Sequence, residues 1–570
     1  MFKEKHIKNK NILIAAISVA VWLLCIVFGG ILYETNDDTA MNLMAAGAYG
    51  DASQYLVYTN ILMGWMFKIL YGIFPGVNVY LWTYLLLNLF SVILICMVLT
   101  DRMNTLPAVF TAFLFNLLLA NDLYINIQYT KNSALYTCVG ALLIALFISK
   151  KGNLPRLIAA SAMLGFGLCT RFNSFLMAVP FAALVILYAL IDSKPDKKTV
   201  ISLALPVIVC AICFGTHVYN HYLDPNWRDY HEFNDIMTEK VDYGNYNFNW
   251  AKDEYLEAGF TEWDFKLLDV WMWNDSEYFS LDKIKTMKEI GDNYKVSGFR
   301  IGADQFKETF SNIGKNAKSV LIADVSLALV AIALLAAIIK KKWKALPFII
   351  VSACFTFGEL YYLVCLRRVE WRVEFIAWTA GMLAVAGVCM LSGVMNSADS
   401  EEKRPLALSS RPVIMAAMAV ICIVSAFIWQ KNNLDYKRTC FNPKTDSSYE
   451  HIQDIHNADG FFVLSIDEMG AGYLGAKNIF EIDRSCAGLY SNMTQVGGWE
   501  IFSPLSDYYG NMLGISDCFK ALVERDDVYY VGNGERMGYL LMWLNEKYGP
   551  DITVTEVEFD GFSAWKFIRQ

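Results

Sequence analysis

Long apolar runs separated by short polar segments occupy most of the chain. A membrane-spanning helix needs roughly 20 consecutive apolar residues, and the pattern predicts eleven such helices before a polar tail begins at residue 431. They cover residues 11–33, 78–100, 105–121, 131–149, 155–170, 174–191, 199–219, 317–339, 345–366, 373–395 and 412–430. The first follows a lysine-rich start, but its core of about 23 residues has no small-residue cleavage site, which predicts an uncleaved anchor.

Composition supports a polytopic membrane protein. Of the 570 residues, 55% are apolar and 18% are charged, whereas a soluble protein carries about 25% charged residues. The net charge of -8 and the pI near 5.5 argue against a nucleic-acid partner. We therefore expect the lipid bilayer to be the main surrounding of this chain.

The distribution of basic residues predicts the orientation, because cytoplasmic loops are rich in Lys and Arg. A cytoplasmic N-terminus gives the inner segments eighteen basic residues and the short outer segments six, so we expect a multi-pass cell-membrane protein with an extracytoplasmic tail. The apolar segment 55–74 would reverse this bias if it crossed the membrane. We therefore expect it to be a helix lying on the outer surface, closed by Pro75 and Gly76.

The predicted fold class is a mainly α polytopic membrane domain, residues 1–430, followed by a small extracytoplasmic α/β domain, residues 431–570. In that tail, strand-like runs alternate with helical stretches such as 534–547. The strand-like runs are 461–466, 478–482, 528–531, 552–559 and 564–568.

Two external loops are predicted, at residues 34–77 and 220–316. The second alternates charged and apolar residues at helical spacing, so we expect short surface helices there. This loop is either a solvated lid or an acceptor-binding cover in which Trp271 or Trp273 stacks on a sugar.

Paired carboxylates follow the first span directly, at Asp37 and Asp38. Carboxylates beside a bilayer are costly unless they are solvated or in use. One interpretation is that they cap a helix beginning near Ala40, because Asp is a good N-cap and the helix dipole favours anions there. The other is that one of them is a general base. The two are compatible, since a capped carboxylate is also a held one.

A basic N-terminus, one span and an acidic pair in an outer loop that continues into surface helices resemble the GT-C superfamily of membrane glycosyltransferases. The resembling segments are NDDTAMNLMAAGAYGD (36–51) and YTNILMGWMFKILYGIFPGVNVYLW (58–82). The layout is similar to the protein O-mannosyltransferase and aminoarabinose-transferase branch. The resemblance implies that Asp37 is the catalytic base, with Asp38 as its neighbour, and that the donor is a polyprenyl-phosphate-linked sugar.

Such a donor leaves an anionic phosphate, so outer basic residues are candidates to bind it. Arg suits phosphate oxygens through its planar fork and Lys acts as a point charge; the alternative for each is that it snorkels to lipid headgroups. The phosphate-binding candidates are Lys131, Arg171, Arg367, Arg368 and Arg372. In GT-C enzymes outer Lys and Arg residues contact the lipid phosphate, but no motif here fixes which.

Two acidic residues, Asp324 and Glu359, lie within predicted spans. Ionisable groups there usually face a cavity or a partner, so both are candidates to line an outward-opening cavity together with Tyr58. The alternative for Glu359 is a structural pair with Arg367 or Arg368. His217 and His221 have no matching ligand cluster. No cofactor is expected with certainty, and assistance by a divalent cation stays open.

The chain has no Walker A loop, dinucleotide fingerprint or Asp-x-Asp motif in a soluble domain, which argues against an ATP-driven pump and a nucleotide-sugar enzyme. We expect an inverting glycosyltransferase that moves a hexosyl or pentosyl group at the outer face of the membrane. Its acceptor would be a hydroxyl of a cell-envelope glycan, lipid or protein. The alternatives are a polysaccharide polymerase or ligase, and a lipid-linked sugar transporter or flippase, although transporters usually place functional charges near the bilayer midplane.

Overall fold

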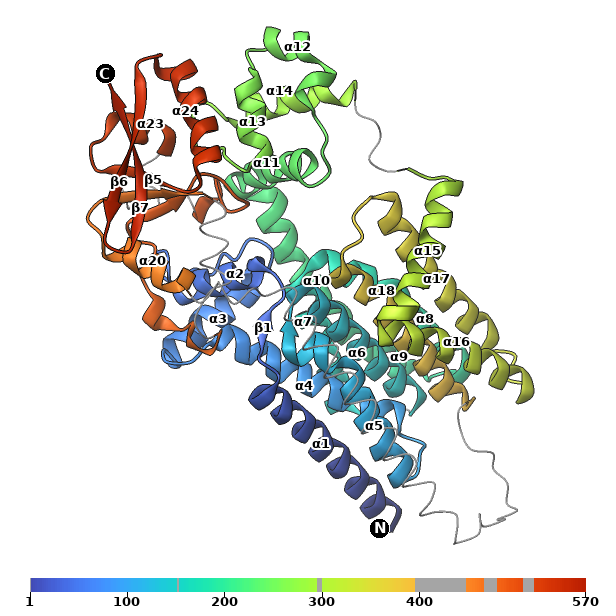
Figure 1. The fold of residues 1–570 in the computed structure, drawn as a ribbon. Helices are drawn as coiled ribbons and strands as arrows, with labels where there is room; N and C mark the ends of the chain where they lie inside the picture. Colours follow the sequence, from blue (N-terminus) through green and yellow to red (C-terminus); the bar gives the residue numbers. More distant parts are fainter. Residues whose placement is uncertain (1, 151–152, 295–299, 395–446, 466–478, 506–516) are drawn as a thin grey trace.

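The computed structural model describes residues 2–150, 153–294, 300–394, 447–465, 479–505 and 517–570 (Figure 1). Within these ranges, nine helices are long and apolar enough to cross a membrane. They are α1 (Phe2–Phe28), α4 (Val79–Leu99), α5 (Thr105–Ala120) with η1 (Asn121–Ile125), α6 (Tyr129–Ser149), α8 (Phe172–Ser193), α9 (Lys197–Ser202) with α10 (Ala204–Val218) and η2 (Tyr219–Leu223), α16 (Leu321–Ile339), α17 (Leu346–Cys365) and α18 (Trp371–Ser392).

The chain is thus a multi-pass membrane protein, and the predicted fold class is confirmed. The predicted span 155–170 forms α7 (Leu154–Thr170), which is apolar but has only 17 residues. The predicted span 412–430 and the predicted domain boundary after residue 430 lie outside the described residues.

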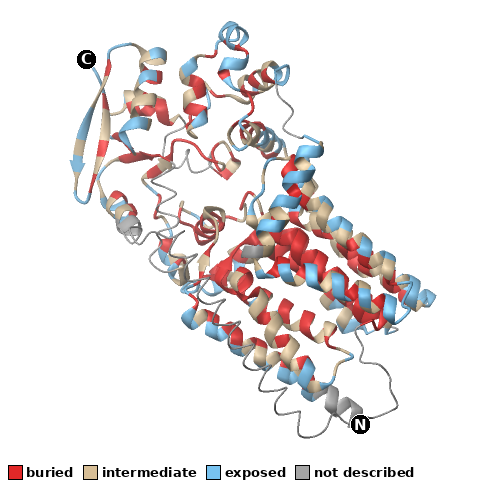
Figure 2. Cartoon of the chain, turned by 45° about the vertical axis from the view of Figure 1, so that its right-hand side comes forward, coloured by how far each residue is buried: buried red, intermediate tan, exposed pale blue. Residues whose placement is uncertain are grey.

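Helices α6 and α18 form the centre of the bundle. Their apolar windows are 94% and 89% buried, against 50% or less for the other candidate spans, and Figure 2 shows this buried interior. A helix that is apolar on all sides belongs in such a core. Close contact needs small residues: a Cβ at Gly140 of α6 would lie 2.6 Å from Cγ of Leu164 on α7.

Segment 55–74 does not form a span. It contains α3 (Ile61–Ile73), whose 13 residues extend about 20 Å at 1.5 Å per residue, too short for a hydrocarbon core of about 30 Å. The helix ends two residues before Pro75, in agreement with the predicted surface helix. Just before it, α2 (Asn36–Ala46) carries the acidic pair.

The described residues of the loop 220–316 form short helices, as predicted. These are α11 (Pro225–Val241), η3 (Phe248–Trp250), α12 (Lys252–Glu257), α13 (Glu262–Asp269), α14 (Leu281–Asp292) and α15 (Ala303–Ser319). A predicted helix in the tail is also present, as α24 (Gly534–Tyr548). The tail additionally contains α20 (Ser447–Asn457), η6 (Arg484–Cys486) and α23 (Cys518–Glu524).

In the part of the tail that the structure describes, five strands form a mixed sheet in the order β4-β3-β5-β7-β6. Strand β3 (Phe461–Leu464) runs parallel to β4 (Met493–Gln495) and β5 (Val528–Val531), while β7 (Phe562–Arg569) runs antiparallel to β5 and to β6 (Ile552–Phe559). Four of the five predicted strands are confirmed, and the three-residue β4 was missed.

The predicted strand at 478–482 is wrong, because its described residues form the 3₁₀ turn η5 (Ile479–Glu481) and no strand. Its carbonyl groups bond to side chains of the membrane domain instead of a neighbouring strand. Asn78 Nδ2 donates to the Ile479 carbonyl at 2.6 Å, and the Tyr71 hydroxyl donates to the Ile482 carbonyl at 3.3 Å.

Helices α11–α14 and the C-terminal sheet share one hydrophobic core, and we call residues 225–292 together with the described residues of the tail the cap. Trp273 from the helical part packs in the same buried cluster as Phe519 and Trp543 from the tail. The backbone N–H groups of Trp273 and Asn274 both donate to the carbonyl of Val496, at 2.9 and 2.8 Å. The cap lies at the end of the bundle where α2 is found (Figure 1).

Candidate active site

Asp37 and Asp38 lie within the first turn of α2, which begins at Asn36 with Thr35 as its N-cap. A helix beginning near Ala40 was therefore the wrong expectation, and neither carboxylate is the cap residue. The position still favours negative charge, because the unpaired N–H groups of a first helical turn carry a partial positive charge.

Asp38 is fully buried and bonded on both oxygens. Its Oδ1 accepts hydrogen bonds from the Tyr80 hydroxyl at 2.9 Å and the Tyr129 backbone N–H at 3.2 Å, and its Oδ2 accepts one from Thr35 Oγ1 at 3.4 Å. Burial raises the pKa of Asp38 well above its usual value, and the hydrogen bond from Tyr80 opposes that rise. Because Tyr129 is the first residue of α6, Asp38 joins the start of α6 to the start of α2.

Asp37 is half-buried and faces cations. The Tyr129 hydroxyl donates to its Oδ2 at 3.4 Å, and the guanidinium of Arg171 donates to the same hydroxyl oxygen. Burial raises the pKa of Asp37 above its usual value, while the positive charges of Arg171, Arg372 and Arg368 oppose the rise. A carboxylate with a raised pKa, partly open to a ligand, has the properties of a general base.

Arg171 occupies the short connection between α7 and α8 and is held by two aromatic rings. Its guanidinium carbon lies 4.8 Å from the ring centroid of Tyr129 and 5.4 Å from that of Tyr58, an arrangement stabilised by cation–π attraction. Tyr58 in turn packs against Trp499 of the cap, with ring centroids 4.9 Å apart. The ring of Tyr58, a predicted cavity-lining residue, thus lies between Arg171 and Trp499.

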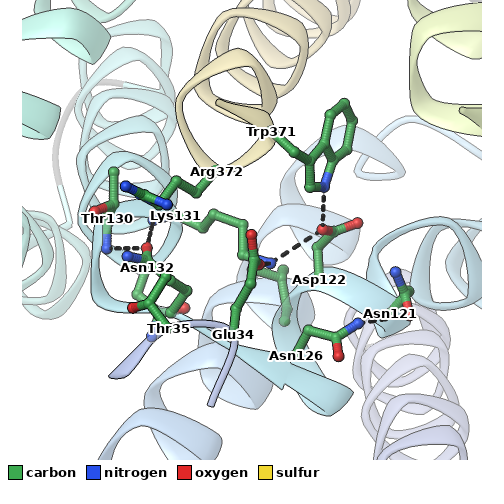
Figure 3. A network of polar contacts seen from close by, with 12 residues as sticks. Glu34, Thr35, Asn121, Asp122, Asn126, Thr130, Lys131, Asn132, Trp371 and Arg372 are labelled. Carbon is green, nitrogen blue, oxygen red and sulfur yellow. Dashed lines mark hydrogen bonds and ion pairs between the residues drawn. The ribbon is translucent and has the colours of Figure 1, made fainter. Parts of the chain in front are cut away.

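Lys131 lies at the centre of a buried network (Figure 3). Its side chain is fully buried and forms ion pairs with Glu34 and with Asp122, the latter at 3.0 Å. Asp122 also accepts a hydrogen bond from the indole of Trp371 at 2.8 Å. A buried ammonium must be paired, and here both partners are carboxylates, so this position leaves Lys131 no open face for a phosphate.

The local fold explains this network. Strand β1 (Leu32–Tyr33) pairs with β2 (Asn126–Ile127), and the Glu34 N–H donates to the Ile127 carbonyl at 3.0 Å. Glu34 is thereby placed beside the first turn of α6. Sequence reasoning missed Asp122 because the predicted third span ended at residue 121, although a carboxylate at the end of a span was a usable indication.

The turn between α17 and α18 carries the other three predicted cations, in different settings. Arg372 is on α18, with Nη1 3.7 Å from a Glu370 carboxylate oxygen, and Figure 3 shows it beside Trp371 pointing toward the Lys131 network. Arg368 pairs with Asp242 of the cap at 2.8 Å. Arg367 is exposed and has a positive φ of 58°. The charges of Arg372 and Arg368 act on Asp37 together with that of Arg171, while Arg367 lines two cavities that do not include Asp37.

The remaining predicted positions do not join this group. Asp324 is exposed in the first turn of α16, and Glu359 Oε2 is buried without a hydrogen-bond partner among the described residues. Trp273 is 1% exposed, so it cannot stack on a sugar in this conformation, and the half-buried Trp271 packs against it with ring centroids 5.4 Å apart.

His217 and His221 lie in one stack with His231. The ring centroids are 4.0 Å apart for His217 and His221 and 3.7 Å apart for His221 and His231. Over the ranges that the structure describes, no group of three or more His, Cys, Asp or Glu residues is placed to hold a metal ion.

No family model and no curated protein sequence matches the chain. Among solved structures, the chain is similar to the crystal structure of ArnT from Cupriavidus metallidurans in the apo state. The two are 11% identical over 98% of this chain and 97% of that chain, with a TM-score of 0.39. A similarity at this level does not show the function of the chain, so the function is inferred from the site alone.

Proposed function

We propose that the protein is an integral membrane glycosyltransferase that moves a sugar from a polyprenyl-phosphate donor to a hydroxyl group of an acceptor. The observation that carries this proposal is the half-buried carboxylate of Asp37, which faces Arg171, Arg372 and Arg368. A base with several guanidinium groups opposite meets both needs of the reaction: removal of a proton from the acceptor and stabilisation of a phosphate leaving group.

In the proposed reaction, Asp37 accepts the proton of the acceptor hydroxyl as its oxygen attacks the anomeric carbon. The bond between that carbon and the phosphate oxygen breaks, and its electron pair leaves with the lipid phosphate. The configuration at the anomeric carbon is inverted, because attack and departure occur on opposite faces. Arg171 and Arg372 stabilise the negative charge that develops on the phosphate, because a planar guanidinium group donates to two phosphate oxygens at once.

The residues around Asp37 hold the base in place. Asp38 fixes the first turn of α2 against α6 through the Tyr129 N–H. Tyr129 then contacts Asp37 and Arg171 with its hydroxyl. A base held on rigid elements loses little free energy to reorganisation when charge develops.

The proposed face is the outer one. The Lys-rich loops, such as the one that contains Lys340, Lys341 and Lys342, belong on the cytoplasmic side by charge. Because α2 follows the first span, a cytoplasmic N-terminus places α2 and the cap outside.

The test is consumption of donor by the purified full-length protein in lipid nanodiscs, with a panel of undecaprenyl-phosphate-linked sugars. We expect the wild type to consume at least one donor, and Asp37→Asn to lower the rate about 10²- to 10⁴-fold, the usual contribution of a general base. Asp51→Asn, an exposed carboxylate in the same loop, is the matched control and should retain the wild-type rate. Full activity of Asp37→Asn, or no donor consumed by the wild type, would refute the proposal, and consumption of lipid-linked oligosaccharides alone would indicate a polymerase or ligase.

A further inference from the structure

Two polar cavities meet at Arg367, in the turn between α17 and α18. One has a volume of about 460 Å³ and lies between α15 and the α17–α18 turn. The other has a volume of about 280 Å³ and lies between the cap and the same turn. Arg367 lines both cavities, so they adjoin, and together they reach the size range of small-ligand sites, about 300–1,000 Å³.

Helix α15 gives the larger cavity a polar wall because its two faces differ. Phe306 and Phe310 pack against Phe357 of α17, with ring centroids 5.3 and 5.1 Å apart. Gln305, Glu308 and Asn312 line the cavity. Their spacing of three and four residues places them on one face of the helix, so apolar packing on α17 leaves the polar stripe facing the cavity.

The charges in the larger cavity are balanced. Glu308 and Glu374 supply two carboxylates, Lys315 and Arg367 supply two cations, and amide side chains lie between them. A site for a phosphate alone would have a surplus of cations. Amide and carboxylate groups together are instead suited to a ligand with many hydroxyl groups, because each hydroxyl both donates and accepts hydrogen bonds.

The smaller cavity adds aromatic rings. Trp250 is 37% exposed and lines this cavity together with Tyr243, Asp242 and Asn245. Tryptophan offers a broad apolar face with a polar edge, and the face of a sugar ring that carries C–H groups matches it. Trp250 thus provides the open aromatic surface that the buried Trp273 does not.

An ion pair joins the wall of the smaller cavity to Arg368, a cation whose charge acts on the proposed base. Asp242, in that wall, pairs with Arg368 at 2.8 Å, and Arg368 is one of the cations whose charge acts on Asp37.

We propose that the two cavities form one groove that binds the acceptor, and that this acceptor is an oligosaccharide of at least two sugar units. One unit stacks on Trp250, and the next is hydrogen-bonded by the polar stripe of α15 and by Glu374. The role of this saccharide as the acceptor rests on the proposed function, whereas the binding of a saccharide in the groove does not. The groove selects a glycan over a lipid or protein hydroxyl.

The test is saturation-transfer NMR on the full-length protein in nanodiscs, without donor, using linear hexasaccharides of glucose, N-acetylglucosamine and mannose as probes. We expect at least one hexasaccharide to bind, and Trp250→Ala and Glu308→Gln each to weaken its Kd at least about tenfold, equal to about 1.4 kcal/mol. Trp250→Phe keeps an aromatic face and should stay within about threefold of the wild type, or about 0.7 kcal/mol. Trp343→Ala removes another exposed tryptophan, which is 59% exposed in the α16–α17 loop and lines neither cavity, and should have no effect.

Absence of binding by all three hexasaccharides, or binding unchanged in both Trp250→Ala and Glu308→Gln, would overturn the groove. Because no turnover is measured, this result is independent of the donor assay. Donor consumption without glycan binding would refute only the groove, and glycan binding without donor consumption would refute only the glycosyltransferase.

Discussion

The two sides of the candidate site are built differently. We call the buried residues around Asp38 and Lys131 the acid side of the site. Both side chains are fully buried; Asp38 accepts from the backbone of α6, and Lys131 pairs with the Asp122 carboxylate. On the cationic side, Arg368 and Arg372 keep 35% and 23% of their side chains exposed and pair with carboxylates that are themselves partly exposed. The residues that surround the base are therefore buried and paired, whereas two of the cations that act on it, including Arg372, which is proposed to meet the phosphate, remain partly open to solvent.

The cap holds the acid side from its far end. Helix α2 is followed by Gly47, whose φ of 91° is left-handed. The Gly47 carbonyl accepts a hydrogen bond from the Gly488 N–H at 2.9 Å. The Arg484 guanidinium donates to the Ala46 carbonyl at 3.0 Å, and the Tyr490 N–H donates to the Ala48 carbonyl at 2.8 Å. Both ends of the helix that carries Asp37 are thus bonded to other segments.

The largest effect is expected from Lys131→Met. It leaves Glu34 and Asp122 buried without their cation, and removal of one partner from a buried pair costs about 3–5 kcal/mol. Lys150→Met is the matched control: Lys150 follows the other end of α6 and pairs with Asp101 at 2.7 Å, but 44% of its side chain is exposed, so its loss should cost at most about 1 kcal/mol.

Thermal unfolding in nanodiscs measures this difference. We expect a much larger fall in Tm for Lys131→Met than for Lys150→Met, and partial recovery when Glu34→Gln and Asp122→Asn are added to Lys131→Met. Equal Tm values for the two single variants would contradict a buried and paired acid side.

Arg171→Met acts where the two sides meet. Burial raises the pKa of Asp37, and of the positive charges that oppose this rise, the charge of Arg171 has the largest effect. Its loss should raise the pKa of Asp37 further, because the strongest of the positive charges that favour the ionised carboxylate is removed. A base works only when deprotonated, so activity falls as pH drops through its pKa, and the acid limb of kcat/KM should move to higher pH in the variant.

The same variant should also lower kcat about 10²-fold at the optimum, because it removes a group that stabilises the leaving phosphate. Arg171→Lys keeps the charge and should restore the position of the acid limb while recovering only part of kcat, since Lys lacks the planar fork. If the acid limb did not shift in Arg171→Met, the charge of Arg171 would not act on the pKa of Asp37.

Sequence alone predicted most helices because spans and amphipathic helices bury whole faces, and burial leaves a periodic pattern. It misplaced elements whose structure depends on distant partners. Residues 478–482 look like a strand, yet their carbonyls bond to Asn78 and Tyr71, about 400 positions earlier. The three residues of β4 are too few to show a period.

For the site, sequence indicated the residue types but not their separate roles. Asp37 and Asp38 are adjacent and chemically identical, and only the contacts of Asp38 with Tyr80 of α4 and Tyr129 of α6 distinguish the buried carboxylate from the half-buried one. Lys131 and Arg171 looked alike as outer cations. Their difference arises from Asp122 and from the rings of Tyr58 and Tyr129, which long-range packing brings together.

The smallest effect expected is that of Arg368→Gln, which tests the cationic side directly. Of the three arginines that act on Asp37, Arg368 contributes least, and its ion pair with Asp242 is partly exposed. Stability should change by less than about 1 kcal/mol, and the acid limb of kcat/KM should move upward by less than in Arg171→Met. Parallel pH–rate profiles and thermal unfolding of both variants measure this order. If Arg368→Gln moved the acid limb further than Arg171→Met, the base would be facing the α17–α18 turn rather than the α7–α8 connection, and the two sides of the site would have to be assigned anew.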